Sequence, residues 1–123
     1  MILNLISKLQ NAQMAHHSTV QFRSGGFCAK ILDILWDNGF IGGYTHLGGG
    51  ILSITLLYED GKPLLKRLTV LSRPTRKLYA SWEEVSALEF PGGLFIVSTT
   101  SGLMSAGEAA RKRLGGEIVA YFG

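Results

Sequence analysis

Four consecutive hydroxyl residues followed by a glycine, Ser98-Thr99-Thr100-Ser101-Gly102, are the most chemically informative stretch of the sequence. Hydroxyl groups and the free backbone N–H groups of a glycine loop can bond phosphate oxygens, ribose hydroxyls and base edges. The hydroxyls of a Ser/Thr turn can also bond only their own backbone. The stretch is therefore a candidate nucleic-acid contact, and the self-bonded turn stays open as the alternative.

Catalytic and metal-binding arrangements are not legible in the sequence. Ser98 and a histidine would make a hydrolase dyad, but no GxSxG elbow surrounds Ser98 and nothing places a base beside it. His16-His17, Cys28 and His46 lack the spacing of metal ligands, and no nucleotide-binding glycine loop is present. We expect no catalytic residue, metal, cofactor or small-molecule substrate. A small serine hydrolase or transferase using Ser98 remains an alternative function.

The segments around the hydroxyl run predict a mainly antiparallel β subdomain over residues 66–123. Residues 94–98 predict a buried strand and 99–102 a loop. Ser105, with Glu108 three residues later, predicts a capped helix over 106–113, and Gly115-Gly116 ends it before a final strand at 117–122. A short strand is expected at 77–80. A turn of helix is expected at 82–85, with Ser81 as its cap and Glu84 in the capping box.

Residues 1–65 predict a helix-strand-helix-strand meander. Residues 2–14 place Leu5, Leu9 and Gln13 on one face at helical spacing. Asp60-Gly61 predicts a tight hairpin turn. Other expected elements are strands at 19–22, from 40, 51–58 and 63–71 (Leu64, Leu68 and Val70 inward) and a helix at 29–36 that closes at Asn38-Gly39. The fold class is therefore α+β with two small subdomains, of which the second has one short helix.

Composition limits the function classes. The 123 residues are 46% hydrophobic and 17% charged, with one cysteine, which excludes an intramolecular disulfide. Residues 1–60 hold three basic and four acidic residues, whereas residues 61–123 hold nine and five, so attraction for polyanions is expected in the second half. No apolar stretch of about 18 residues predicts a membrane span. Lys8 lies inside the apolar start, which is not typical of a secretory signal.

Four ordered blocks of the chain resemble small-subunit ribosomal protein eight, the bacterial-type universal family. The hydroxyl run begins the first block, STTSGLM, and EAARKRLGGEIVAY comes after it in the chain. The spacing from Ser98 to Glu117 is twenty positions, as in that family. Upstream, LSRPTRKLY resembles its VSRPGLRIY block. LISKLQNAQ resembles its first helix and ILDILWDNGFI its second.

The resemblance implies a structural constituent of the small ribosomal subunit that supports assembly and translation. It implies binding to the central domain of the ribosomal RNA, at an irregular helix, mainly through the second subdomain. By match to the family's motifs, the implied RNA-binding residues are Ser98, Thr99, Thr100, Ser101, Gly102, Met104, Gly115, Gly116, Glu117, Arg73, Lys77, Tyr79, Lys8 and Asn11. Implied protein neighbours are small-subunit proteins five, twelve and two.

The chain also departs from the family pattern. Ser101 stands where the family usually has a basic residue, and Ala106-Gly107 replace an acidic-basic pair. With the low charge, this drift favours an organellar ribosome in the mitochondrial matrix, with the bacterial cytoplasm or a plastid as alternatives. A protein-interaction scaffold without RNA contact is a further alternative function.

Overall fold

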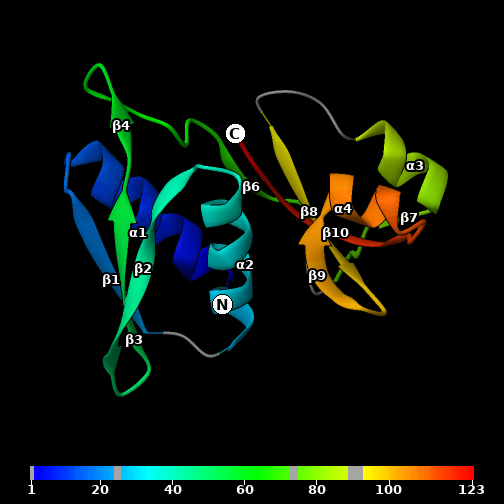
Figure 1. Ribbon diagram of the computed structural model, residues 1–123, viewed down its shortest axis with the longest axis horizontal. Helices are drawn as coiled ribbons and strands as arrows, with labels where there is room; N and C mark the ends of the chain where they lie inside the picture. The colour runs from blue at the N-terminus through cyan, green and yellow to red at the C-terminus, as the bar shows by residue number, and fades with distance from the viewer. Residues whose placement is uncertain (1, 24–25, 73–74, 89–92) are drawn as a thin grey trace. The chain divides into compact units, whose positions relative to one another are not determined.

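A computed structural model of the chain describes residues 2–23, 26–72, 75–88 and 93–123. The chain divides into two compact units, Met1–Lys66 and Arg67–Gly123, which we call unit 1 and unit 2 (Figure 1). Each unit combines helices with an antiparallel sheet, so the predicted α+β class is confirmed. No helix in the described ranges is both long and apolar enough to span a membrane.

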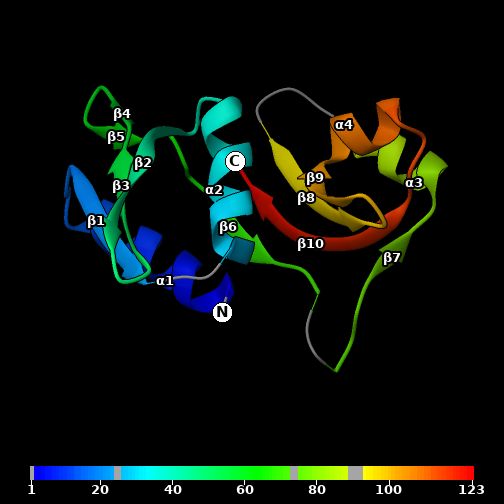
Figure 2. The ribbon, with the colours of Figure 1, turned by 60° about the horizontal axis from the view of Figure 1, so that its bottom comes forward.

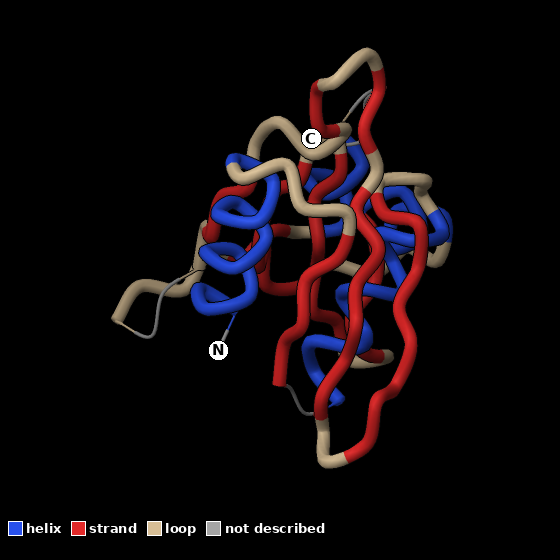
Figure 3. Tube along the Cα trace, turned by 90° about the vertical axis from the view of Figure 1, so that its left-hand side faces the viewer, coloured by secondary structure: helices blue, strands red, loops and turns tan. Residues whose placement is uncertain are grey.

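Unit 1 is built on a three-stranded antiparallel sheet with the strand order β1-β3-β2. Figure 3 shows these strands side by side. The elements in chain order are α1 (Ile2–Met14), β1 (Thr19–Arg23), α2 (Gly26–Asp37), β2 (Ile41–Gly48), β3 (Ile51–Leu56), β4 (Tyr58–Glu59) and β5 (Lys62–Pro63).

The inner face of α1 is the one that helical spacing predicts. Leu5 and Leu9 are fully buried, and Gln13 is the one buried polar residue of the described core, 5% exposed. Leu32 of α2 and Ile54 of β3 are also fully buried. The apolar stripes of both helices therefore supply the hydrophobic burial that stabilises unit 1.

The hairpin after β4 follows its local sequence, but the strand expected after it does not. Asp60 and Gly61 have φ of 52° and 76°, which a two-residue hairpin turn requires. The strand predicted over 63–71 is wrong as a single element, because the chain leaves β5 at Pro63 and reaches the sheet of unit 2 only at β6 (Leu68–Val70). Leu65 between them is buried in place of Leu64.

Unit 2 is centred on β10, which has partners on both sides. The strand order is β6-β10-β8-β9. Strand β7 lies on the same side of β10 as β6 and pairs with the start of β10, whereas β6 pairs with its end. Figure 2 shows the long, curved β10 alongside β8. The elements are β6, β7 (Tyr79–Ala80), α3 (Trp82–Ala87), β8 (Leu94–Thr99), β9 (Gly102–Ser105), α4 (Ala106–Arg111) and β10 (Gly116–Phe122).

Both predicted helix caps are present in unit 2. The backbone N–H of Glu84 donates to the Ser81 hydroxyl, and the Ser81 N–H donates to the Glu84 carboxylate, which completes a capping box. The Ser105 hydroxyl accepts from the Glu108 N–H. The turn of helix predicted at 82–85 extends to Ala87, so unit 2 has a second short helix, α3, packed beside α4. Strand β9 is not among the predicted elements, which place Gly102 in a loop and Ser105 at a helix cap.

Candidate nucleic-acid interface

Three strands bring three of the predicted RNA-binding residues into one row. Glu117 of β10 lies opposite Tyr79 of β7 on one side and opposite Ser98 of β8 on the other. Directly opposite residues of antiparallel strands point to the same face, with Cβ atoms about 4.5–5.5 Å apart. The neighbours Val97 and Ile118 pack with residues of α3 and α4, so by alternation the row lies on the opposite face. We call Tyr79, Glu117 and Ser98 the polar row.

Gly115 and Gly116 allow the strands of the row to approach. A Cβ at Gly115 would lie 2.6 Å from the carbonyl oxygen of Ala80. A Cβ at Gly116 would collide with the backbone carbonyl of Ser98. Real Cβ atoms do not come so close to backbone atoms, so a side chain at either position would push β10 away from β7 or β8. The structure thus gives both glycines a role in setting the register of the polar row.

The hydroxyl run forms the turn between β8 and β9. Thr99 and Gly102 are opposite residues, and Gly102 has a φ of 107° that favours glycine. The Thr99 hydroxyl donates to the Gly102 carbonyl (2.9 Å) and accepts from the Ser101 backbone N–H (3.1 Å). Thr99 therefore bonds its own turn, as the alternative interpretation expected. Thr100 and Ser101 are exposed at the tip.

Two hydroxyls at this turn have no hydrogen-bond partner among the described residues. Within the described ranges, the side chains of Ser98 and Thr100 make no hydrogen bond, and neither does the carboxylate of Glu117. Ser98 and Glu117 are half-buried, and Thr100 is exposed. These groups have hydrogen-bonding capacity available for a ligand.

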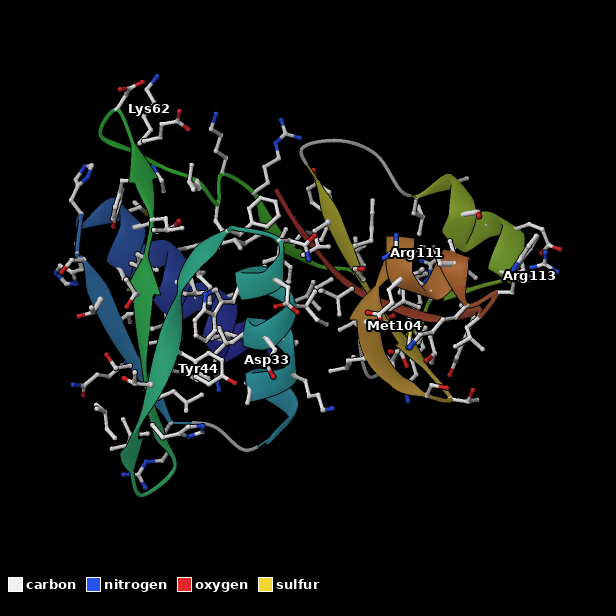
Figure 4. All side chains as sticks on the ribbon, in the orientation of Figure 1. Asp33, Tyr44, Lys62, Met104, Arg111 and Arg113 are labelled. Atoms are coloured by element: carbon white, nitrogen blue, oxygen red, sulfur yellow. The ribbon has the colours of Figure 1, made fainter. Side chains whose placement is uncertain are left out.

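The side chain of Met104 lies in the core of unit 2. It is only 4% exposed and packs with Val97 and Ala109. Figure 4 labels it on β9. Because the thioether is enclosed by apolar side chains, it supports the hydroxyl turn from within and does not present its own side chain to a ligand.

Ser72 fixes the segment that leads into β7, and sequence reasoning did not single it out. Its hydroxyl donates to the Ile118 carbonyl (2.5 Å) and accepts from the Leu78 N–H (3.0 Å). The Ile118 N–H donates in turn to the Leu78 carbonyl (2.8 Å). Tyr79 follows Leu78 directly and is 71% exposed, so its backbone is fixed within the polar row while its ring is open to solvent. The position of Ser72 in the sequence block LSRP was the signal that could have identified it.

The cations predicted near the polar row are only partly visible. Lys77 is exposed, two residues before Tyr79. Arg73 lies outside the described residues. In the run Arg111–Arg113, Lys112 pairs with Glu108 at 3.3 Å, and the Arg113 guanidinium lies 5.8 Å from the centre of the Trp82 ring. The last two cations are therefore engaged within unit 2.

The predicted charge asymmetry becomes smaller when the chain is divided where the structure divides it. Unit 1 contains five basic and four acidic residues, and unit 2 contains seven and five. Lys62 and Lys66 were counted with residues 61–123 in the sequence, but in the structure they belong to unit 1. Net charges of +1 and +2 do not by themselves favour one unit for RNA binding. The arrangement of polar side chains must therefore distinguish the two units.

Unit 1 has a polar groove that contains both of its predicted RNA-binding residues. Lys8 and Asn11 are exposed on α1 and line a groove of about 420 Å³ between α1 and β1. The spacing of its α1 residues puts them on the face away from the apolar stripe. The full lining is Asn4, Ser7, Lys8, Asn11, Gln21, Phe22 and Arg23. Sequence reasoning missed Asn4, Ser7, Gln21 and Arg23, although the helical spacing of Asn4, Ser7 and Asn11 was readable.

The described surroundings of Ser98 do not support the hydrolase alternative. Unit 2 contains no histidine, and the cross-strand neighbours of Ser98 are Glu117 and Leu103. Among the described residues, no cluster of three or more histidine, cysteine or acidic side chains is arranged to hold a metal ion.

The sequence pattern of the family described as ribosomal protein S8 matches residues 1–122. The chain belongs to the ribosomal protein S8 family. It is similar to the small ribosomal subunit protein uS8 of Acidiphilium cryptum, with 35% identity over 120 residues, covering 94% of this chain and 92% of the relative. The proteins of the same name from Hyphomonas neptunium and Pelagibacter ubique are 32% and 34% identical over 119 residues, covering 94% of this chain and 91% of each relative.

Membership of this family makes the chain a structural protein of the small ribosomal subunit. Binding of ribosomal RNA is general for the family. Among the described residues, the polar row, the hydroxyl turn and the groove of unit 1 are candidate surfaces for this binding.

Proposed function

We propose that the chain binds the central domain of the small-subunit ribosomal RNA through the polar row and the hydroxyl turn. The observation that carries this proposal is the strand register, in which Glu117 lies between Tyr79 and Ser98. The turn with Thr100 continues the same hairpin directly after Ser98. Groups from three strands thus gather on one face, next to the turn that carries Thr100, without depending on net charge.

Each member of this surface has a defined chemical use toward RNA. The hydroxyls of Ser98 and Thr100 can donate to phosphate or ribose oxygens and accept from ribose hydroxyls. The carboxylate of Glu117 accepts hydrogen bonds from the amino group of guanine or cytosine. The exposed ring of Tyr79 stacks on an unpaired base. Such contacts require bases that are splayed out of a regular helix, so the preferred target is an irregular helix or internal loop.

The groove of unit 1 supplies contacts of a second kind. Lys8 and Arg23 are long cations that reach phosphate oxygens, and Asn11 can bond to sugar or phosphate. These contacts position the protein on the RNA backbone, whereas the polar row reads base edges and shape.

The test is a binding titration with a central-domain RNA fragment. We compare the wild-type chain with the triple variant Ser98→Ala, Thr100→Ala, Glu117→Ala. Each specific contact is worth about 1–3 kcal/mol, so the variant should bind at least about 100-fold more weakly.

The control carries the same three changes of residue type elsewhere in unit 2. Thr69→Ala, Glu83→Ala and Ser86→Ala alter exposed residues of β6 and α3. The control variant should bind within about twofold of wild type. Equal binding by both triple variants would remove the polar row from the interface.

The narrower assignments follow from the same proposal. We assign the chain to a mitochondrial ribosome because only 17% of its residues are charged and it lacks cations usual in the family. Small-subunit proteins five, twelve and two are its proposed neighbours, and a catalytic role is not part of the proposal. Co-sedimentation with a mitochondrial small subunit supports this assignment, and co-sedimentation with a bacterial or plastid small subunit contradicts it.

A further inference from the structure

An aromatic cluster stands at the edge of unit 1 and is used by neither surface described above. Trp36 of α2 is 50% exposed and contacts the Tyr44 ring of β2 edge-on, with 5.9 Å between ring centres. Tyr44 contacts the His46 ring in the same way at 5.7 Å. Large exposed apolar side chains that gather in one place mark interaction sites.

The backbone of β2 is shaped to build this cluster. The register between Ile41 and Gly43 shifts by one residue, which places Tyr44 and His46 opposite the buried Ile54 and Leu52. Both rings therefore lie on the side of the sheet that α2 covers.

Gly43 and Asp33 fix the rings. Gly43 has a φ of 113°, and a Cβ there would lie 2.7 Å from the Trp36 ring, so the indole rests directly on its backbone. The Tyr44 hydroxyl donates to the Asp33 carboxylate at 2.5 Å, and Figure 4 shows the two side chains facing each other. The rings are held in place before any partner arrives, which lowers the entropic cost of binding.

The charge around the cluster selects the partner. Asp33, Trp36 and Asp37 are exposed and lie on one face of α2, since they are three and four residues apart. Lys30, exposed three residues before Asp33, is the one cation of this helix, so the two carboxylates leave a net negative charge beside the indole, which repels a phosphate backbone. The carboxylates attract a guanidinium group, which can also stack on an aromatic face.

We propose that the cluster of Trp36, Tyr44 and His46 docks an arginine-bearing segment of a neighbouring protein in the assembled small subunit. The proposal rests on the proposed function, because the partner is met on the ribosome. An arginine side chain would stack on the Trp36 ring while its guanidinium donates to Asp37 or Asp33.

The experiment places a photoreactive benzoyl-phenylalanine at position 36 of the full-length chain in assembled small subunits. Sedimentation of the variant with the subunit tests the proposed function separately. After irradiation, the cross-linked product should resist ribonuclease, and its partner peptide should contain arginine. The same probe at Met14, which is 80% exposed on α1, is the matched control. A cross-link from position 36 to RNA, or one no stronger than from position 14, would overturn the proposal.

A second measurement avoids any dependence on assembly of that variant. In a Trp82→Phe chain, Trp36 is the sole tryptophan, and its fluorescence reports binding. We titrate with a short arginine-glycine peptide, the matching glutamate-glycine peptide and an oligouridylate. The arginine peptide should bind most tightly, and Asp37→Asn should weaken it about fivefold, whereas Asp60→Asn on the distant turn of the same unit should not. Preference for the oligouridylate, or no effect of Asp37→Asn, would contradict the proposal.

Discussion

The two candidate RNA-binding surfaces of this chain are built in different ways. The polar row of unit 2 uses a hydroxyl, a carboxylate and an aromatic ring whose positions are set by backbone pairing, with Glu117 opposite both Tyr79 and Ser98. The groove of unit 1 uses longer side chains, among them Lys8 and Arg23, on one helix and one edge strand. The units differ by one net charge, so the difference lies in how rigidly polar groups are presented.

This comparison assigns a distinct task to each surface. Donors and acceptors held at fixed positions discriminate between bases and shapes, because a displaced ligand loses its hydrogen bonds. Flexible cations attract phosphate regardless of sequence, and salt weakens that attraction. We therefore expect unit 2 to determine specificity and unit 1 to supply attraction that depends on salt.

The largest expected effect comes from breaking the register of the polar row. Gly116→Ala introduces a Cβ against the Ser98 carbonyl, so β10 must move away from β8. We expect the free energy of unfolding to fall by about 2–3 kcal/mol and specific RNA binding to be lost. Chemical denaturation and RNA titration measure the two effects. Gly49→Asn is the control, because Gly49 has open space around it and a φ of 62° that asparagine tolerates.

A smaller effect is expected from the ring at the end of the row. Tyr79→Ala removes a stacking surface and should weaken RNA binding by about 1–3 kcal/mol. Tyr79→Phe keeps the ring and should bind within about twofold of wild type. Because Tyr79 is 71% exposed, thermal stability should change little in either variant. Equal loss in both variants would mean that the hydroxyl, not the ring, makes the contact.

The capping box after β7 tests how firmly the row is supported. Ser81→Ala should lower the stability of unit 2 by about 1 kcal/mol and weaken RNA binding only slightly. The hydrogen bond from the Ser81 backbone N–H is the main cause that lowers the pKa of Glu84, and the hydrogen bond with the Ser81 hydroxyl is the second. The stabilisation from Glu84 is therefore present above the ordinary carboxyl pKa and is lost as the pH falls through the lower folded pKa. Denaturation of wild type and Glu84→Gln from pH 7 to acid should show the two stabilities converging.

The smallest effect on RNA binding is expected at the aromatic cluster of unit 1. The hydrogen bond to Asp33, followed by burial, raises the pKa of Tyr44 to about 12. The resulting stabilisation is complete below the ordinary tyrosine pKa near 10 and is lost as the pH rises through about 12. Asp33→Asn should lower the Tyr44 pKa in an ultraviolet titration while RNA affinity stays unchanged. A loss of RNA affinity would place the cluster in the RNA interface.

The features that were predictable from sequence are those decided by near neighbours. Ser81 with Glu84, Ser105 with Glu108, and Asp60-Gly61 each determine a cap or a turn within four residues. The apolar face of α1 was predictable for the same reason, since helical spacing is local.

The features that sequence could not predict depend on distant strands. Strand β9 forms because Thr99–Gly102 closes a hairpin against β8. The register shift after Ile41, which turns Tyr44 toward α2, is invisible in the alternation of the sequence. The function of Gly116 as a close-packing position needed the location of the Ser98 carbonyl. Family resemblance indicated which residues gather, but only strand register indicated how.

The most direct test of the account is a salt series of RNA-binding titrations on three proteins. These are the wild type, the row variant Ser98→Ala, Thr100→Ala, Glu117→Ala, and the groove variant Lys8→Ala, Arg23→Ala. The row variant should give a line of log affinity against log salt that is parallel to wild type and about 100-fold lower. The groove variant should lower the slope by about 2 and approach wild type at high salt. A row variant that binds like wild type at every salt concentration would contradict the account.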